Sequence, residues 1–415
     1  MKITASIITI GDELLIGQVI DTNSAWIAQQ LNKIGVWVQR RIAVGDVWND
    51  IWNTLDEESK LSDIILITGG LGPTSDDITK PLLRKYFNGK LIIDEAALQN
   101  VKNIFSLLNR PMLQVNLQQA EVPDVCKVIQ NARGTAPGMW FERDGKIFIS
   151  MPGVPHETMG MMTNYVLPNL KQKFSLPYIG HRTLLTAGVG ESFLAERIKD
   201  FEKTLPSYFK LAYLPNYGMI RLRLTAQNEN KKTTEKELNN QFEKLQSLIK
   251  DVLVTNEDIS MEEIIGRLLK EKNKTVATAE SCTGGYIAHL ITSVRSSSDY
   301  FIGSVISYNN GIKKDMLYVS ETTLNSVGAV SEETVVQMIK GILTVMKTDY
   351  AIAVSGIMGP DGGTSEKPIG TVWIAVGSNE KIETKKFYFR FDRKRNIELT
   401  AINALNLLRL FVLKN

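Results

Sequence analysis

The sequence predicts an α/β protein: two α/β domains, the first with a parallel sheet, joined by a small α+β domain. Its 415 residues, at roughly 100–200 per domain, correspond to two to four domains. Short β-branched runs alternate with helical patterns at both ends of the chain, which is typical of parallel sheets with crossover helices. This alternation breaks in the middle, where strand-like runs precede a highly charged helical stretch. We therefore expect domains at residues 1–168, 169–257 and 258–415.

The elements follow in order from these patterns. In the first domain we expect strands at 6–10, 37–43 and 63–68 and helices at 23–31 and 51–61, with Asn23-Ser24 as the first N-cap. In the middle we expect strands at 183–187, 209–214 and 219–226 and helices near 192–201 and 233–251. Ser260 and Glu263 form a capping-box pattern that begins the third domain. There we expect strands at 275–279, 303–308, 350–355, 370–376 and 384–391, and helices at 284–293, 331–347 and from 396.

Composition narrows the class of protein. The chain is 43% hydrophobic and 22% charged, which excludes collagen-like, coiled-coil and disordered readings. A net charge of +3 provides no large positive field, so nucleic acid is an unlikely partner. Cys126 and Cys282 lie far apart, which excludes a disulfide framework and a structural zinc site. The apolar run at residues 1–10 meets charge too early for a signal peptide, and we predict no membrane span, so we expect a cytoplasmic protein.

A glycine-rich motif, residues 69–79, follows a buried strand and precedes a helix. Its glycines let backbone N–H groups approach an anion, and the helix N-terminus favours negative charge. Asp76 and Asp77 beside such a site predict a bound divalent cation. The alternative is a tight turn with aspartate caps. Gly11-Asp12-Glu13 and Gly45-Asp46 follow neighbouring strands, and loops 133–138 and 151–157 are candidates to border the same pocket; His156 is a plain loop residue in the simpler interpretation.

This segment resembles the molybdopterin-binding type domain that opens the competence/damage-inducible protein A (CinA) family. The resemblance is carried by Gly11–Leu14 with Asp21-Thr22-Asn23, by Gly69–Thr79 and by Met151–Pro155. It implies a nucleotide-like ligand and an ADP-ribose pyrophosphatase activity that depends on a divalent metal ion (Mg, Mn or Co). By motif, functional aspartates fall on Asp46 and Asp77. The implied nucleotide site comprises Gly11, Glu13, Asp46, Gly69, Gly70, Gly72, Thr74 and Asp77, with Asp76 and Asp77 at the metal.

In the third domain, Ser281 follows a short strand and precedes a helix. A serine on such an elbow has backbone N–H groups beside it that can hold an oxyanion, although an N-cap role is the simpler alternative. The one histidine of this domain, His289, lies eight residues along the next helix, about 12 Å away, so a Ser-His-Asp triad is excluded. Lys313, which follows Tyr308 after the next strand, is the remaining candidate base; otherwise it is a surface lysine.

A second glycine-rich loop follows the strand at 350–355. It carries Gly356, Gly359, Gly362 and Gly363, with hydroxyls at Ser355 and Thr364 that we expect to be exposed, and suits a phosphate-bearing substrate. A hairpin-like turn is the alternative interpretation. Cys282 is expected to be a small buried apolar residue rather than a nucleophile.

These segments resemble the nicotinamide mononucleotide amidohydrolase domain that closes the same family. Ala279–Gly285 and Gly356–Val372 carry the resemblance, which spans residues 258–415 and departs from the usual pattern at Asn309 and Met358. It implies hydrolysis of the nicotinamide carboxamide, release of ammonia and no cofactor. By motif, the nucleophile is Ser281, the Tyr/Lys pair is Tyr308 and Lys313, and a phosphate-binding arginine falls on Arg393, with Arg395 as the alternative. The implied substrate site also holds Thr283, Gly284, Gly285, Ser355, Gly356, Gly359, Gly362, Gly363 and Thr364.

Three classes of function follow. The leading hypothesis is a pyridine-nucleotide salvage enzyme that acts on nicotinamide mononucleotide and on ADP-ribose. The second is an N-terminal domain that binds a molybdopterin-like ligand without hydrolysis. The third is a regulatory or scaffold protein linked to competence and DNA damage. The family resemblance also implies a homodimer.

Overall fold

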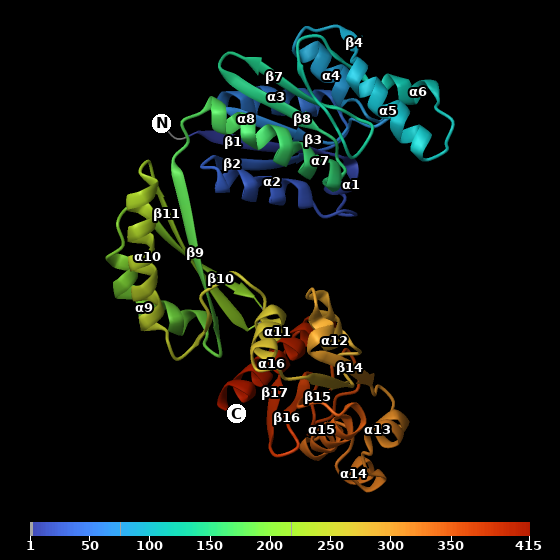
Figure 1. Ribbon diagram of the computed structural model, residues 1–415, viewed down its shortest axis with the longest axis vertical. Helices are drawn as coiled ribbons and strands as arrows, with labels where there is room; N and C mark the ends of the chain where they lie inside the picture. Colours follow the sequence, from blue (N-terminus) through green and yellow to red (C-terminus); the bar gives the residue numbers. More distant parts are fainter. Residues whose placement is uncertain (1–2, 75, 217) are drawn as a thin grey trace. The chain divides into compact units, whose positions relative to one another are not determined.

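The computed structural model describes residues 3–74, 76–216 and 218–415. Met1, Lys2, Ser75 and Tyr217 lie outside the described residues, so the start of the N-terminal apolar run and one residue of the first glycine-rich motif are not placed. The chain forms two compact units, Met1–Gly180 with Ala226–Leu238, and His181–Thr225 with Asn239–Asn415. Figure 1 shows the sheets and helices of each, and the fold is mixed α/β as predicted.

A six-stranded sheet forms the centre of the N-terminal domain, in the order β2-β1-β3-β8-β7-β6. The first four of these strands are parallel, whereas β7 and β6 run antiparallel to their neighbours. A separate small sheet pairs two short strands. The strands are β1 (Thr4–Ile10), β2 (Trp37–Val44), β3 (Ile64–Thr68), β6 (Lys127–Ile129), β7 (Gly138–Arg143) and β8 (Lys146–Met151), with β4 (Leu91–Ile93) and β5 (Glu121–Pro123) in the small sheet.

Helices cover both faces of this sheet. One apolar core joins it to α2 (Thr22–Lys33), α7 (Pro155–Met161) and α8 (Leu167–Lys173), and the other joins it to α3 (Trp48–Leu61) and α4 (Thr79–Tyr86). The prediction of Asn23-Ser24 as the cap of α2 was wrong: the Asp21 carboxylate accepts from the Ser24 N–H at 2.9 Å. The remaining helices are α1 (Asp12–Leu15), α5 (Glu95–Leu107), α6 (Gln114–Gln118) and the π-helical turn η1 (Met162–Val166).

The middle segment is a small α+β structure. Its four-stranded sheet has the order β10-β11-β9-β12 and is accompanied by two helices. The elements are β9 (Tyr178–Ala187), α9 (Glu191–Lys203), β10 (Phe209–Asn216), β11 (Met219–Asn228), α10 (Lys231–Leu248) and β12 (Leu253–Thr255).

The C-terminal domain is a second three-layer α/β structure, with the sheet order β14-β13-β15-β16-β17. One face packs against α11 (Met261–Glu271), α12 (Tyr286–Ser293) and α16 (Arg393–Lys414), and the other against α13 (Asn310–Leu317) and α15 (Glu332–Met346). The strands are β13 (Val276–Glu280), β14 (Phe301–Ile306), β15 (Tyr350–Gly356), β16 (Thr371–Gly377) and β17 (Ile382–Tyr388); α14 (Glu321–Ser326) and the 3₁₀ turn η2 (Ser297–Asp299) complete the domain.

Both large sheets share a strand order that determines where a ligand can bind. In each, the first strand lies between the second and third strands, and all three are parallel. The connection from the first strand to the second covers one face of the sheet, and the connection from the second to the third covers the other, so a crevice opens at the carboxyl ends of the first and third strands. The residues that follow β1 and β3, and those that follow β13 and β15, are therefore the expected ligand contacts.

Helix α16 is long and apolar enough to cross a membrane by length and composition, and 56% of its most apolar window is buried inside the protein. Its Ala404, Leu405, Leu408 and Phe411 belong to the apolar core that covers the C-terminal sheet. We interpret α16 as a core helix, because most of its apolar residues are buried in the core, although Leu410 and Leu413 are exposed.

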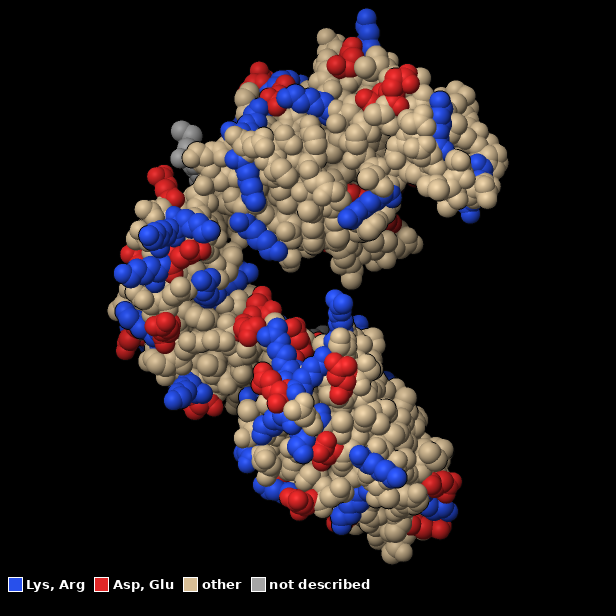
Figure 2. Space-filling model, viewed as in Figure 1, with Lys and Arg blue, Asp and Glu red and all other residues tan. Residues whose placement is uncertain are grey.

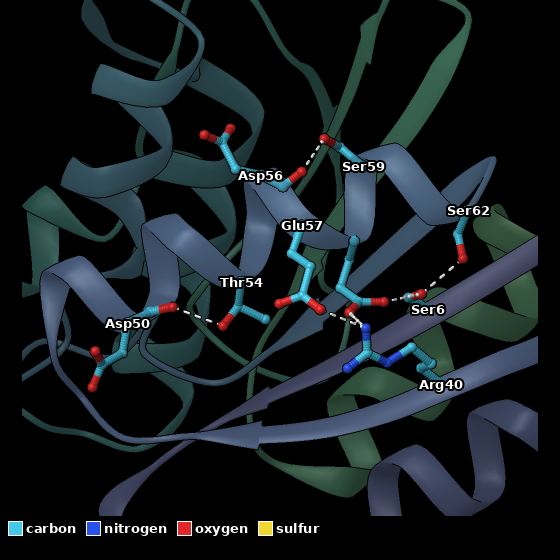
Figure 3. A network of polar contacts seen from close by, with 9 residues as sticks. Ser6, Arg40, Asp50, Thr54, Asp56, Glu57, Ser59 and Ser62 are labelled. Carbon is cyan, nitrogen blue, oxygen red and sulfur yellow. Dashed lines mark hydrogen bonds and ion pairs between the residues drawn. The ribbon is translucent and has the colours of Figure 1, made fainter.

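Polar contacts of Ser6 and Arg40 connect the N-terminal sheet to α3 and to Ser62, which follows α3 (Figure 3). Glu58 is 1% exposed; it accepts a hydrogen bond from the Ser6 hydroxyl of β1 at 2.5 Å and forms an ion pair with Arg40 of β2 at 2.8 Å. Ser6 also exchanges a hydrogen bond with Ser62 at 2.7 Å. Because an unsatisfied buried carboxylate is costly, these contacts hold α3 in register on the sheet.

We predict that Ser6→Ala lowers the free energy of unfolding of the N-terminal domain by about 1–3 kcal/mol, because Glu58 loses a buried donor. Urea unfolding followed by tryptophan fluorescence measures this, since Trp26, Trp37, Trp48, Trp52 and Trp140 are five of the six tryptophans. Ser59→Ala is the matched control: Ser59 donates to the Asp56 carbonyl within α3 and interacts with the Tyr86 hydroxyl rather than with Glu58, so its change should stay within about 0.5 kcal/mol. Equal effects of the two variants would contradict the role of Glu58.

Candidate active sites

A cavity of about 420 Å³ lies at the carboxyl ends of the parallel strands of the N-terminal sheet. The glycine-rich loops after β1 and β3 meet there, as the strand order requires. Gly69 shows how closely: a Cβ atom on it would lie 2.2 Å from the Ile10 carbonyl oxygen. The sequence-predicted residues that line the cavity are Gly11, Glu13, Asp46, Gly69, Gly70, Gly72, Asp76 and Asp77, joined by Thr135, Ala136, Pro152, Gly153, Val154 and Glu157 from the two loops expected to border it.

Carboxylates gather on one side of this cavity. The backbone N–H groups of Asp12 and Asp46 each donate to the other residue's carboxylate at 3.2 Å, which ties the two loops together. Burial raises the pKa of Asp46, and the negative charges of Asp12, Glu13 and Asp76 raise it further. Such mutual repulsion is relieved when a cation approaches, so this side of the cavity favours cationic or metal-associated ligands.

Asp77 is oriented from within the glycine-rich loop. Its carboxylate accepts from the Thr74 N–H at 2.9 Å and from the Thr74 hydroxyl, so Thr74 acts through Asp77 and does not line the cavity. Lys80, which sequence reasoning missed, lies close enough to Asp77 to feel its charge; it donates to the Gln118 and Gln119 carbonyls, and burial lowers its pKa. No pattern in the sequence distinguishes this lysine from exposed ones.

The donor set determines how a metal ion could bind. Within the described residues, no three His, Cys, Asp or Glu side chains are arranged to hold a metal ion. Mg²⁺ commonly binds through one or two carboxylates together with phosphate oxygens of the substrate. Asp76 and Asp77, both at the cavity, fit that mode, in which the ligand completes the coordination.

In the C-terminal domain, the Ser281 elbow is built around Glu280, which sequence reasoning did not single out. Glu280 ends β13 fully buried, and its carboxylate accepts from the N–H groups of Gly285, Ile287 and Ala288 at 2.8–3.1 Å. The Thr283 hydroxyl donates to it at 2.7 Å. These donors belong to the turn before α12 and to its first residues, so the carboxylate satisfies the helix N-terminus and fixes the elbow.

The elbow leaves few amides for an oxyanion. The Ser281 N–H donates to the Val354 carbonyl, and the Gly284 N–H donates to the Ser281 carbonyl. Among the described hydrogen bonds, the N–H groups of Cys282 and Thr283 have no backbone or carboxylate acceptor. They are therefore the free backbone donors closest in sequence to the Ser281 hydroxyl. Cys282 is itself buried, which raises its pKa to about 12, so its thiol is neutral, as expected for a packing residue.

Lys313 is buried, and the alternative of a surface lysine is wrong. Its side chain is 1% exposed, and its Nζ atom donates to the Ser307 carbonyl at 2.7 Å. Burial lowers its pKa, and its charge interacts with Cys282 beside the elbow. The Ser307 N–H in turn donates to the Glu280 carbonyl at 2.8 Å. The ends of β13 and β14 thus place the lysine beside the serine segment.

Arg393 connects the other predicted elements. It is the first residue of α16, and its guanidinium donates to the Tyr308 hydroxyl at 2.8 Å and to the Gly359 carbonyl at 2.9 Å. Tyr308 remains 62% exposed, so this pair forms an accessible rim. Arg395 lies over the Phe391 ring, 4.2 Å from its centre. It lines a pocket that includes neither Tyr308 nor Gly359. Of the two arginines, Arg393 is the one that contacts the glycine-rich loop.

The glycine-rich loop differs in part from expectation. Ser355 is 1% exposed and donates to the Ala329 carbonyl at 2.6 Å, so the expectation of an exposed hydroxyl was wrong there. The exposed Thr364 hydroxyl accepts from the Lys367 N–H at 3.0 Å and closes a turn. Gly356 ends β15, Gly359, Gly362 and Gly363 follow it, and Gly284 and Gly285 lie at the elbow beside Thr283. A cavity of about 410 Å³ is lined by Thr283, Gly284, Gly285, Tyr286 and His289.

Comparison with known proteins matches three family models along the chain. They are the probable molybdopterin binding domain at residues 6–172, the damage-inducible protein CinA KH domain at 181–254, and the CinA C-terminal domain at 258–412. The KH match gives a family to the middle segment, which the sequence predicted only as α+β. This segment has no Gly-x-x-Gly sequence between residues 181 and 254.

Relatives match over nearly their full length. A CinA-like protein of Cytophaga hutchinsonii is 46% identical over 407 residues, which cover 98% of this chain and 97% of the relative. A CinA-like protein of Flavobacterium psychrophilum is 45% identical, with 99% of each chain covered. A solved competence/damage inducible protein of Agrobacterium tumefaciens is 34% identical, covers 38% of this chain and 98% of its own, and has a TM-score of 0.36. The chain therefore belongs to the CinA family, with a molybdopterin-binding-like domain, a KH domain and a CinA C-terminal domain in succession.

Proposed function

We propose that the C-terminal domain hydrolyses the carboxamide of nicotinamide mononucleotide to nicotinate mononucleotide and ammonia. The observation that carries this proposal is the buried Lys313 beside the Ser281 elbow, since a desolvated lysine is the base that a serine nucleophile needs where histidine is absent. His289, the one histidine of this domain, is exposed on α12. The carboxamide specificity comes from the family resemblance, and the residues support the amidase chemistry.

The chemistry follows from the positions of these groups. The Ser281 Oγ atom attacks the carboxamide carbon while its proton passes to the neutral amine of Lys313. The tetrahedral oxyanion accepts hydrogen bonds from the Cys282 and Thr283 N–H groups. Collapse breaks the C–N bond, and the ammonium form of Lys313 returns the proton to the leaving ammonia. Water then hydrolyses the acyl-enzyme by the reverse use of the same base, which releases the carboxylic acid and restores Ser281.

Arg393 is suited to the substrate phosphate. Its guanidinium is anchored to Gly359 and Tyr308 at the accessible rim, where it can pair with an anion. Tyr308, whose hydroxyl accepts from Arg393, retains a proton to donate to the substrate. This arrangement selects a phosphorylated nicotinamide over the free amide.

For the N-terminal domain we propose hydrolysis of ADP-ribose at the carboxylate-lined cavity. A divalent cation held by Asp76, Asp77 and the pyrophosphate would supply neutralisation of the developing negative charge. The glycine-rich loop and the start of α4 would bind the phosphates through backbone N–H groups. The absence of a ready three-ligand metal site among the described residues favours a second candidate, in which this cavity binds a molybdopterin-like ligand without hydrolysing it.

We predict that Ser281→Ala and Lys313→Met each lower ammonia release from nicotinamide mononucleotide by about 10³-fold or more, because members of a catalytic unit act together. Mass spectrometry of products, with nicotinamide mononucleotide and ADP-ribose supplied separately, measures both activities. Lys314→Met is the matched control, since the exposed Lys314 side chain, as far as the described residues show, makes only a 3.8 Å ion pair with Glu321. ADP-ribose cleavage should be unchanged in all three. Near-normal ammonia release by Lys313→Met would leave water or Tyr308 as the base.

The pH profile gives an independent prediction. Burial lowers the pKa of Lys313, and only its neutral form accepts the serine proton, so kcat/KM should rise with pH and level off below the ordinary lysine pKa of about 10.4. Lys313→Arg, which cannot lose its proton, should be inactive at every pH. Measuring ammonia release across the pH range for the parent protein and for Lys313→Arg tests both expectations. A profile that is flat, or that falls as pH rises through this range, would exclude lysine as the base.

In the N-terminal domain, Asp77→Asn should abolish metal-dependent ADP-ribose cleavage and leave ammonia release intact. The amide oxygen can still accept from Thr74, so the loop keeps its support while the charge is lost. Asp144→Asn is the control, because Asp144 is exposed in the β7–β8 turn at a positive φ that asparagine also adopts. If neither the parent nor the variants cleave ADP-ribose with Mg, Mn or Co, ligand binding without hydrolysis replaces the proposed activity.

A further inference from the structure

Helix α16 carries a buried arginine far from the proposed catalytic groups. Arg409 is 8% exposed, and its Nε atom donates to Asn406 Oδ1 at 3.0 Å. No ion pair joins its guanidinium to an Asp or Glu among the described residues, and burial alone lowers its pKa. Arg393 starts the same helix 16 residues earlier, about 24 Å away at 1.5 Å per residue. Arg409 therefore takes no part in the amidase site.

An unpaired buried guanidinium requires a physical reason. Arginine remains protonated in proteins, and burial of a charge without a counter-charge or a full set of hydrogen bonds is strongly unfavourable. Arginines that lie inside proteins are accordingly paired. One Asn406 carbonyl satisfies one of the five N–H donors of Arg409, and the remaining four lie on the two terminal nitrogens, which are not fully enclosed by protein atoms and so are open to an acceptor.

Arg409 lines a cavity of about 210 Å³, in which other donors also lie. Asn406 and Lys385 line the same cavity. Asn406 uses its carbonyl oxygen toward Arg409, and its amide N–H₂ has no acceptor among the described hydrogen bonds. The Lys385 ammonium lies 5.2 Å from the centre of the Phe387 ring, which also faces the cavity.

The negative charge at this cavity is already neutralised. Asp251 is the one carboxylate among its lining residues, and it forms a 2.8 Å ion pair with Arg197. Two cations, Arg409 and Lys385, thus face the cavity without a free counter-charge. The cavity has room for a small ion or a short phosphorylated group. Its volume is half that of the cavity in the N-terminal domain.

We propose that this cavity is a binding site for a small phosphate-class oxyanion, held by the Arg409 guanidinium with Lys385 and the Asn406 amide. Guanidinium and phosphate match in a planar, bidentate geometry, which makes arginine the preferred ligand for such an anion. Because the anion binds only the folded protein, it raises the thermal stability of the unit that contains α16.

The test is differential scanning calorimetry of the full chain with inorganic phosphate, at constant ionic strength made up with chloride. The parent protein should show a saturable rise of about 2–4 °C or more in one transition with phosphate and none with chloride alone. Arg409→Met should lose this rise. In phosphate-free buffer its transition should not fall below that of the parent, because an apolar side chain replaces an unpaired buried charge.

Two further variants make the result specific. Arg390→Met removes an exposed arginine that stacks over the Tyr388 ring at 5.2 Å, and it should keep the phosphate response. Lys385→Met leaves Arg409 in place and should weaken phosphate binding several-fold by isothermal titration calorimetry, which covers the case in which Arg409→Met fails to fold. A parent protein without a phosphate-specific rise, or an Arg409→Met variant that retains it through phosphate bound elsewhere, overturns the proposal.

Discussion

The buried carboxylate of Glu280 is the interaction on which the C-terminal site depends. It takes up three backbone N–H groups around the start of α12 and the Thr283 hydroxyl, donors that would otherwise be unsatisfied inside the domain. The same residue's carbonyl accepts from the Ser307 N–H, and the Ser307 carbonyl accepts from Lys313. A single residue therefore orients both the segment that carries the proposed nucleophile and the segment that holds the proposed base.

Strand order explains why both large domains place their candidate sites alike. In each sheet the first strand lies between the second and the third, so the loops after the first and third strands meet at one crevice. The N-terminal domain has Gly11 and Gly69 there, and the C-terminal domain has Ser281 and the loop from Gly356. Their chemistry differs because the first crevice gathers carboxylates, whereas the second gathers a buried lysine and an arginine.

The middle domain matches a KH model, although its sequence has no Gly-x-x-Gly, the loop with which KH domains clamp nucleotides. Basic and acidic side chains are interspersed on the face shown in Figure 2, in agreement with the net charge of +3. The phosphate-class site proposed at Arg409 relates the KH-matching segment to small anions, since Gly188 and Asp251 also line that cavity.

The sequence by itself determined the α/β class, the succession of domains and the segments that carry the candidate sites, because hydrophobic periodicity and glycine-rich turns are local properties. Local pattern also indicated the Ser281 elbow and the loops around the N-terminal cavity. Tertiary structure decided which polar groups are buried. Lys313 and Arg409 look like any surface cation in the sequence, Ser355 looks exposed, and Asn23-Ser24 looks like the cap that Asp21 in fact provides. Only the packing of helices on the sheets withdraws water from some of these side chains and leaves it on others, and that desolvation is what changes a lysine into a candidate base.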